Sequence, residues 1–177
     1  MSESKDDSQF EKWVALTTSF VAVGLAISTI LNNAAGDDLL MFRSLANNQW
    51  SYFQSKSIKQ NMVEIEHDNL SLELEDETLT ETFKTKIKAK QAFYQEQIKR
   101  YDTEKEDISK EAKDAEEKME KADKKGSKFD LAEALYQISI IMAAIALIAK
   151  NRFTWYMSVG LGTLAIGFTA YAHFFMP

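Results

Sequence analysis

Two apolar stretches decide the fold: VALTTSFVAVGLAISTIL at residues 14–31, and LAEALYQISIIMAAIALIAKNRFTWYMSVGLGTLAIGFTAYAHFF at residues 131–175. A helix needs about 20 predominantly apolar residues to cross the hydrocarbon core of a bilayer. The first stretch is long enough for one crossing. The second is interrupted only at Lys150, Asn151 and Arg152, so it divides into two crossings joined by a tight basic turn. We therefore predict three transmembrane helices.

The residues between these stretches are rich in charge and free of proline, since the single proline is Pro177. Proline is the residue that most reliably breaks helices, so a nearly all-helical chain is expected. The segments that we predict are a polar tail at residues 1–12, transmembrane helices at 13–31, 129–149 and 153–175, and soluble helices at 37–74 and 78–125. Two soluble helices of similar length bring the chain back to the membrane as an antiparallel hairpin.

Several residues mark where the predicted helices can begin and end. The stretch from Asn32 to Asp37 predicts a flexible joint, with Asp37 as the N-cap of the first soluble helix. Thr78 or Thr80 can cap the second one. Gly126 is expected to end it, and Ser127 with Asp130 to begin the next helix as a capping pair.

Apolar residues recur at heptad spacing along both soluble helices, which indicates a coiled-coil-like seam. In the first helix the series is Ile58, Met62, Ile65, Asn69 and Leu72. In the second it is Ile87, Tyr94, Ile98, Tyr101, Ile108, Ala112, Ala115, Met119 and Ala122. The expected fold class is an all-α membrane protein with three transmembrane helices and a long antiparallel hairpin between the first two.

Amides and aromatic residues gather near the start of the first soluble helix. This segment can form a polar and aromatic layer that binds a partner or a small polar ligand, or Trp50 and Phe53 can simply pack the hairpin. The interaction candidates are Asn47, Trp50, Phe53, Gln54, Tyr94, Ile98 and Tyr101.

The same segment reads WSYFQSKSIK from Trp50 to Lys59, with Tyr52, Gln54, Lys56 and Ser57 inside it. It resembles a WxYxQxKSxK-like stretch in a family of small bacterial membrane proteins that are catalogued as a domain of unknown function. The resemblance covers essentially the whole chain and implies one N-terminal span, a charged helical middle and a C-terminal pair of spans. It implies no activity.

Polar and small residues inside the predicted spans are candidates for a pore or a helix interface. Glu133 lies with Asp130 in the first turn of the second span, where headgroups and the positive helix end can accommodate it. The candidates are Glu133, Gln137, Ser139, Gly160, Thr163 and Gly167. Small residues of the third span form a stripe at steps of three and four, namely Gly160, Thr163, Gly167 and Ala170. The stripe favours close packing against Ala143, Ala146 and Ala149 of the second span, or between subunits.

Several classes of function are disfavoured. The formal net charge is -6, and lysines are interleaved with acids instead of forming a basic face, so nucleic acid is not an expected partner. The chain has no cysteine and no Gly-rich phosphate loop. Only Glu64 shares a helix face with His67, so no metal site or other cofactor is expected. We expect no enzymatic activity.

The basic residues suggest an orientation. One side of the bilayer has Lys5, Lys12, Lys150 and Arg152, and the hairpin side has nearly as many basic residues near the membrane: Arg43, Lys118, Lys121, Lys124, Lys125 and Lys128. Short basic loops such as Lys150 to Arg152 weigh more than long ones and usually stay in the cytoplasm. We therefore expect a multi-pass protein of a bacterial inner membrane with a cytoplasmic N-terminus and a periplasmic hairpin. The expected function is a membrane-anchored structural or interaction protein that self-associates. The alternative is an oligomeric ion channel, a transport subunit or a membrane regulator. The expected partners are the lipid bilayer, further copies of the chain and other membrane proteins.

Overall fold

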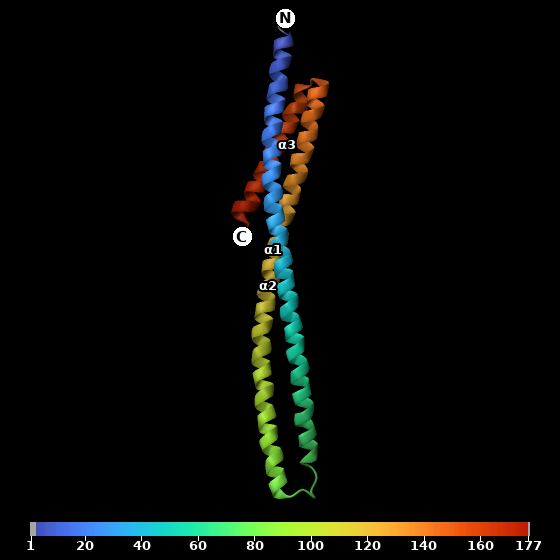
Figure 1. Ribbon diagram of the computed structural model, residues 1–177, viewed down its shortest axis with the longest axis vertical. Coiled ribbons are helices and arrows are strands. Elements are labelled where there is room, and N and C mark those ends of the chain that lie inside the picture. Colours follow the sequence, from blue (N-terminus) through green and yellow to red (C-terminus); the bar gives the residue numbers. More distant parts are fainter. Residues whose placement is uncertain (1–2, 177) are drawn as a thin grey trace. The chain divides into compact units, whose positions relative to one another are not determined.

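A computed structural model describes residues 3–176, and this part of the chain consists of three helices without a strand (Figure 1). Helix α1 spans Glu3–Glu73, α2 spans Glu81–Ala149 and α3 spans Arg152–Phe175. All three contain a window that is long and apolar enough to cross a membrane. The described residues divide into a three-helix unit, residues 3–41 and 118–176, and a two-helix unit, Phe42–Glu117.

The expected joint at Asn32–Asp37 is wrong, because α1 continues through it without interruption. The expected break at Gly126 and Ser127 is wrong as well, since α2 also continues and the Ser127 hydroxyl donates to the Asp123 carbonyl within the helix. One glycine inside a helix costs about 1 kcal/mol relative to alanine. Ending the helix would instead leave several backbone donors and acceptors without partners, so Gly36 and Gly126 are tolerated inside their helices.

The three-helix unit has α1 and α2 antiparallel, with α3 packed beside both (Figure 1). Its largest fully buried side chain is Tyr136, which packs with Val21, Ala132 and Ala165. Trp155 at the start of α3 contacts the Phe10 ring of α1, with centroids 5.9 Å apart. The start of α3, with Trp155, therefore lies beside the start of the apolar part of α1, where Trp13 is found.

A tight turn joins α2 to α3. Lys150 adopts a positive φ of 50°, a left-handed conformation that commonly ends helices. The Asn151 side chain then caps α3 by accepting a hydrogen bond from the Phe153 amide at 2.9 Å. Lys150 also donates to the Asp7 carboxylate at 2.6 Å, and this bond raises the pKa of the lysine. The basic turn predicted from the sequence is thus fixed to the first turns of α1.

The two-helix unit is an antiparallel pair, the last part of α1 and the first part of α2, joined by a turn after Glu73 (Figure 1). In this turn Asp76 accepts hydrogen bonds from the Thr78 amide at 2.8 Å and the Thr78 hydroxyl at 2.6 Å. These bonds hold the pKa of the Asp76 carboxyl below its ordinary value.

Candidate functional site

On α2, the side chains that face α1 follow the expected heptad series. Three of the interaction candidates belong to this series, Tyr94, Ile98 and Tyr101, and all three are partly buried. The series expected for α1 is wrong as the seam of this pair. Ile58, Met62, Ile65 and Leu72 are between 60% and 65% exposed, and Asn69 is exposed too. These five residues, called the outer stripe below, have no partner helix in the described part of the chain.

The face of α1 that does meet α2 also has heptad spacing, but half of it is polar. Its buried or partly buried members are Ala46, Gln49, Phe53, Lys56, Gln60, Val63, His67 and Leu70. Three of the four polar members find partners on α2: Gln49 donates to Glu111 at 2.8 Å, Lys56 to Glu104 at 2.6 Å and Gln60 to Asp102 at 2.9 Å. Polar complementarity between the helices, which hydrophobic periodicity does not detect, therefore selects this face. A heptad search along α1 that accepted polar residues as well as apolar ones could have found this face.

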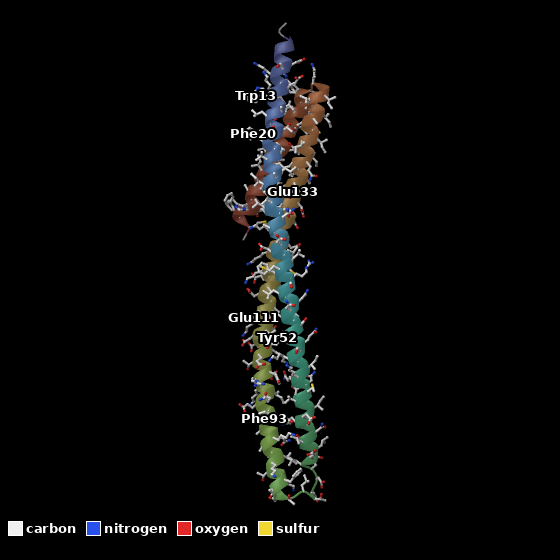
Figure 2. All side chains as sticks on the ribbon, viewed as in Figure 1. Trp13, Phe20, Tyr52, Phe93, Glu111 and Glu133 are labelled. Carbon is white, nitrogen blue, oxygen red and sulfur yellow. The ribbon has the colours of Figure 1, made fainter. Side chains whose placement is uncertain are left out.

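Lys56 and Gln60 are the centre of this polar layer. Lys56 lies over the rings of Tyr52 and Tyr101, with its ammonium nitrogen 5.3 Å and 5.6 Å from the centroids. The hydrogen bond to Glu104 raises the pKa of Lys56 and lowers that of Glu104. Gln60 is 6% exposed, and its side-chain oxygen has no hydrogen-bond partner in the described residues. Figure 2 shows Tyr52 on α1 and Glu111 on α2 at the level of this pair of helices.

The amide and aromatic segment is divided by the packing. The Trp50 indole donates to Glu116 at 2.8 Å and meets the Phe53 ring edge-on at 5.6 Å, so these two aromatics pack the hairpin. Asn47 and Gln54 are exposed beside them and make no side-chain hydrogen bond within residues 7–176.

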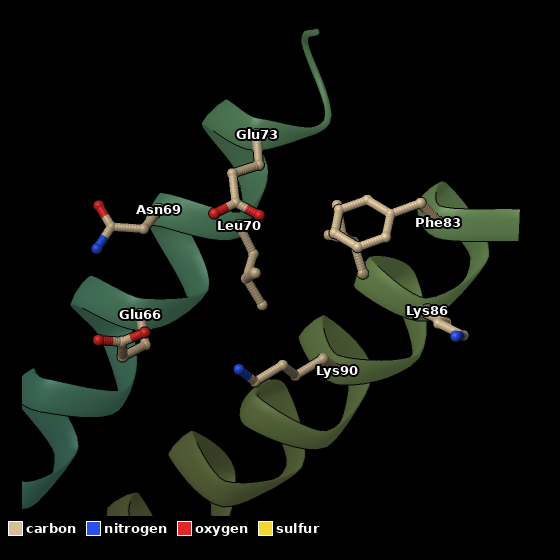
Figure 3. Close-up of a pocket in the computed structure, with 8 residues that line it drawn as sticks. Glu66, Asn69, Leu70, Glu73, Phe83, Lys86 and Lys90 are labelled. Carbon is tan, nitrogen blue, oxygen red and sulfur yellow. The ribbon is translucent and has the colours of Figure 1, made fainter. Parts of the chain in front are cut away.

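A hollow of about 590 Å³ lies between α1 and α2 near the turn (Figure 3). Acidic side chains come from α1 and basic ones from α2: Glu66, Glu73, Lys86 and Lys90. Leu70 points between the helices, whereas Asn69 points away from α2 (Figure 3). No three His, Asp or Glu side chains among the described residues are grouped so that they could hold a metal ion.

Two of the pore candidates of the three-helix unit, Glu133 and Ser139, are hydrogen-bonded within the chain. Glu133 accepts a hydrogen bond from the Asn32 amide at 3.1 Å, and Asp130 accepts one from the same amide at 2.7 Å. The buried Ser139 hydroxyl donates to the Ser158 carbonyl at 2.8 Å, and the Ser158 hydroxyl donates to the Ser139 carbonyl at the same distance. The polar groups of Glu133 and Ser139 are thus satisfied by hydrogen bonds within the chain.

Gln137 differs from its neighbours. It is exposed on α2, and its side chain has no hydrogen-bond partner within residues 7–176.

The small residues of α3 form two stripes, and the structure packs the one that sequence reasoning missed. Gly160, Thr163 and Gly167 are exposed, and a Cβ added to either glycine would meet nothing within 4 Å. The buried stripe is Ser158, Gly162, Ala165, Thr169 and Ala172. A Cβ at Gly162 would approach Val21 to 2.9 Å and the Ser139 hydroxyl to 3.1 Å. The expected packing of the first stripe against α2 is therefore wrong within one chain.

An apolar groove of about 530 Å³ runs along α1 and α3 in the three-helix unit. Exposed side chains such as Phe20, which Figure 2 labels, form much of its wall. Its polar members are Tyr136, Thr169 and His173. The Thr169 hydroxyl lies 3.4 Å from the Tyr136 hydroxyl, so the polar groups at its floor face one another.

Comparison with known proteins adds the family but no activity. Neither the curated proteins nor the solved structures contain a significant match to the chain. A family described as a domain of unknown function, DUF4337, matches residues 10–175, which is nearly the whole chain. The chain belongs to this family of unknown function, DUF4337.

Proposed function

We propose that this protein is a membrane-anchored helical hairpin that associates with further copies of itself. Three helices apolar enough to cross a bilayer support the anchor. The observation that carries self-association is the outer stripe, four apolar residues and Asn69 at heptad spacing with no partner helix in the described residues. Exposed apolar surface of this regularity is typical of a protein interface.

The anchor sets how two copies meet. Copies inserted in one bilayer with the same topology present α1 in the same direction, so their outer stripes approach in parallel. Ile58, Ile65 and Leu72 would then occupy one set of heptad layers, and Met62 and Asn69 the other. A single asparagine in such a layer pairs with its own copy and fixes register, at some loss of stability.

The cysteine-free sequence allows a direct test of this contact. Ile65→Cys should give a disulfide-linked dimer when membranes are oxidised, because the two Ile65 positions share one layer. Lys88→Cys, at an exposed position of α2, is the matched control and should stay monomeric. Equal cross-linking of both variants, or none at Ile65→Cys, would contradict the proposal.

The orientation belongs to the same proposal. The N-terminus and the turn around Lys150 lie on the cytoplasmic side of a bacterial inner membrane, and the hairpin extends into the periplasm. The basic residues of the short turn support this placement. A reporter that is active only in the cytoplasm, inserted in the turn at Asp76, should be inactive. A periplasmic reporter at the same position should be active, and the opposite pair of results would reverse the orientation.

A further inference from the structure

We infer that Gln137 binds its own copy within the bilayer, through paired side-chain amides across a two-fold axis. The inference rests on the proposed function and deepens it, because it names a membrane contact between the associated copies. The hairpin stripe and this contact lie on different helices and can be tested separately.

Gln137 is the unpaired amide of the second span. It lies seven residues beyond Asp130, about 10 Å further along the helix at 1.5 Å per residue, and therefore inside the predicted span at 129–149. It is exposed, and its amide has no partner within residues 7–176. Glu133 and Ser139, its polar neighbours in this span, both have partners in the chain.

An unpaired amide facing hydrocarbon is unfavourable, because lipid tails offer neither donor nor acceptor. The remedy in membrane proteins is a hydrogen bond to a neighbouring helix. Gln137 lies four residues beyond Glu133, about 6 Å further along the helix from the end of the span.

A second copy fits this amide for a chemical reason. A glutamine amide carries both a donor and an acceptor, so two of them related by a two-fold axis satisfy each other with two hydrogen bonds. Glu133 and Asp130, on the same side of the helix before Gln137, accept hydrogen bonds from Asn32, and beyond Gln137 this face carries no charge within the span. It presents Ala134, Ile141 and Ala144, all exposed and spaced at three and four residues, and the alanines allow close approach of a second helix.

The experiment uses the full chain in lipid vesicles and a cysteine at Ala134, one turn from the amide. Ala134→Cys should form a disulfide-linked dimer on oxidation. Adding Gln137→Leu, which keeps the size and removes the amide, should lower the cross-linked fraction by roughly tenfold, whereas Gln137→Asn should retain most of it. Ile30→Cys, at an exposed position of α1 that belongs to neither proposed contact, is the control and should not cross-link.

Two outcomes separate this inference from the proposed function. If Ile65→Cys cross-links but Ala134→Cys does not, or if Gln137→Leu leaves the Ala134→Cys dimer unchanged, the Gln137 contact is wrong and the hairpin association stands. If neither cysteine cross-links, both are wrong. Cross-linking of Ala134→Cys only to a different membrane protein would also overturn the inference. Circular dichroism of each variant establishes that its helices have formed.

Discussion

Gly160 and Gly162 are two residues apart on α3 and have opposite surroundings. A Cβ at Gly162 would press against Val21 and Ser139, whereas one at Gly160 would meet nothing within 4 Å. The Ser139 hydroxyl cannot move away freely, because it is hydrogen-bonded to the Ser158 carbonyl. The glycine at 162 is therefore required by packing and the glycine at 160 is not.

Gly162→Ala should lower the free energy of unfolding by about 1–3 kcal/mol, the usual cost of overpacking a filled core. Gly160→Ala is the matched control and should leave it unchanged or raise it by up to about 1 kcal/mol, because alanine is the better helix former. Denaturant titration of the detergent-solubilised protein, followed by tryptophan fluorescence, measures both. Equal effects of the two substitutions would mean that α3 does not pack on this stripe.

Sequence spacing could not choose between the two stripes of α3. Gly160, Thr163 and Gly167 recur as regularly as Gly162, Ala165 and Thr169, and both sets are small. Other helices determine which stripe is buried, through the hydrogen bonds of Ser139 and the contact of Val21 with Gly162. A single sequence does not contain that information in its periodicity.

At the scale of elements, the sequence predicted the inward face of α2 but not that of α1. The α2 series is mostly apolar or aromatic, so its period is visible. On α1 the apolar period at Ile58–Leu72 is exposed, and the seam instead uses Lys56 and Gln60, which are bonded to Glu104 and Asp102. The helix boundaries at Asn32–Asp37 and at Gly126 failed for a related reason, because cap-forming residues permit a helix end without requiring one.

The Lys56–Glu104 pair makes the hairpin sensitive to pH. The pKa of Glu104 is lowered in the folded chain by the hydrogen bond from Lys56. A carboxyl group whose pKa is lowered by folding stabilises the folded chain at pH values above its unfolded pKa, near 4.5. This stabilisation is lost as the pH falls through the folded pKa. The raised pKa of Lys56 sets the other limit, since its contribution is lost as the pH rises above 10.5 through the folded pKa.

Replacing Glu104 by glutamine should therefore destabilise the hairpin near neutral pH and flatten the acid side of its stability profile. Glu96→Gln, at an exposed position of α2 outside the seam, is the control and should keep the wild-type profile. Thermal unfolding followed by circular dichroism between pH 3 and 7 provides the comparison, with pH values chosen around the ordinary pKa of glutamate. An unchanged acid slope in Glu104→Gln would show that this pair does not support the hairpin.

For the whole molecule, membership of DUF4337 and three apolar helices agree with the architecture expected from the sequence, but neither identifies an activity. The apolar stretches were predictable because a bilayer requires a minimum length of apolar helix. The surfaces that lack partners were not predictable, since only the packed chain shows that the outer stripe and Gln137 remain exposed. Our account of function depends on those two surfaces being covered by another copy.

The mass of the intact protein in a mild detergent, measured by light scattering with the detergent contribution subtracted, tests self-association most directly. We predict a mass of at least two chains for the wild type. The double variant Met62→Glu and Ile65→Glu, which places charges in the outer stripe, should shift the population toward smaller complexes. A wild-type mass equal to one chain would contradict the central claim.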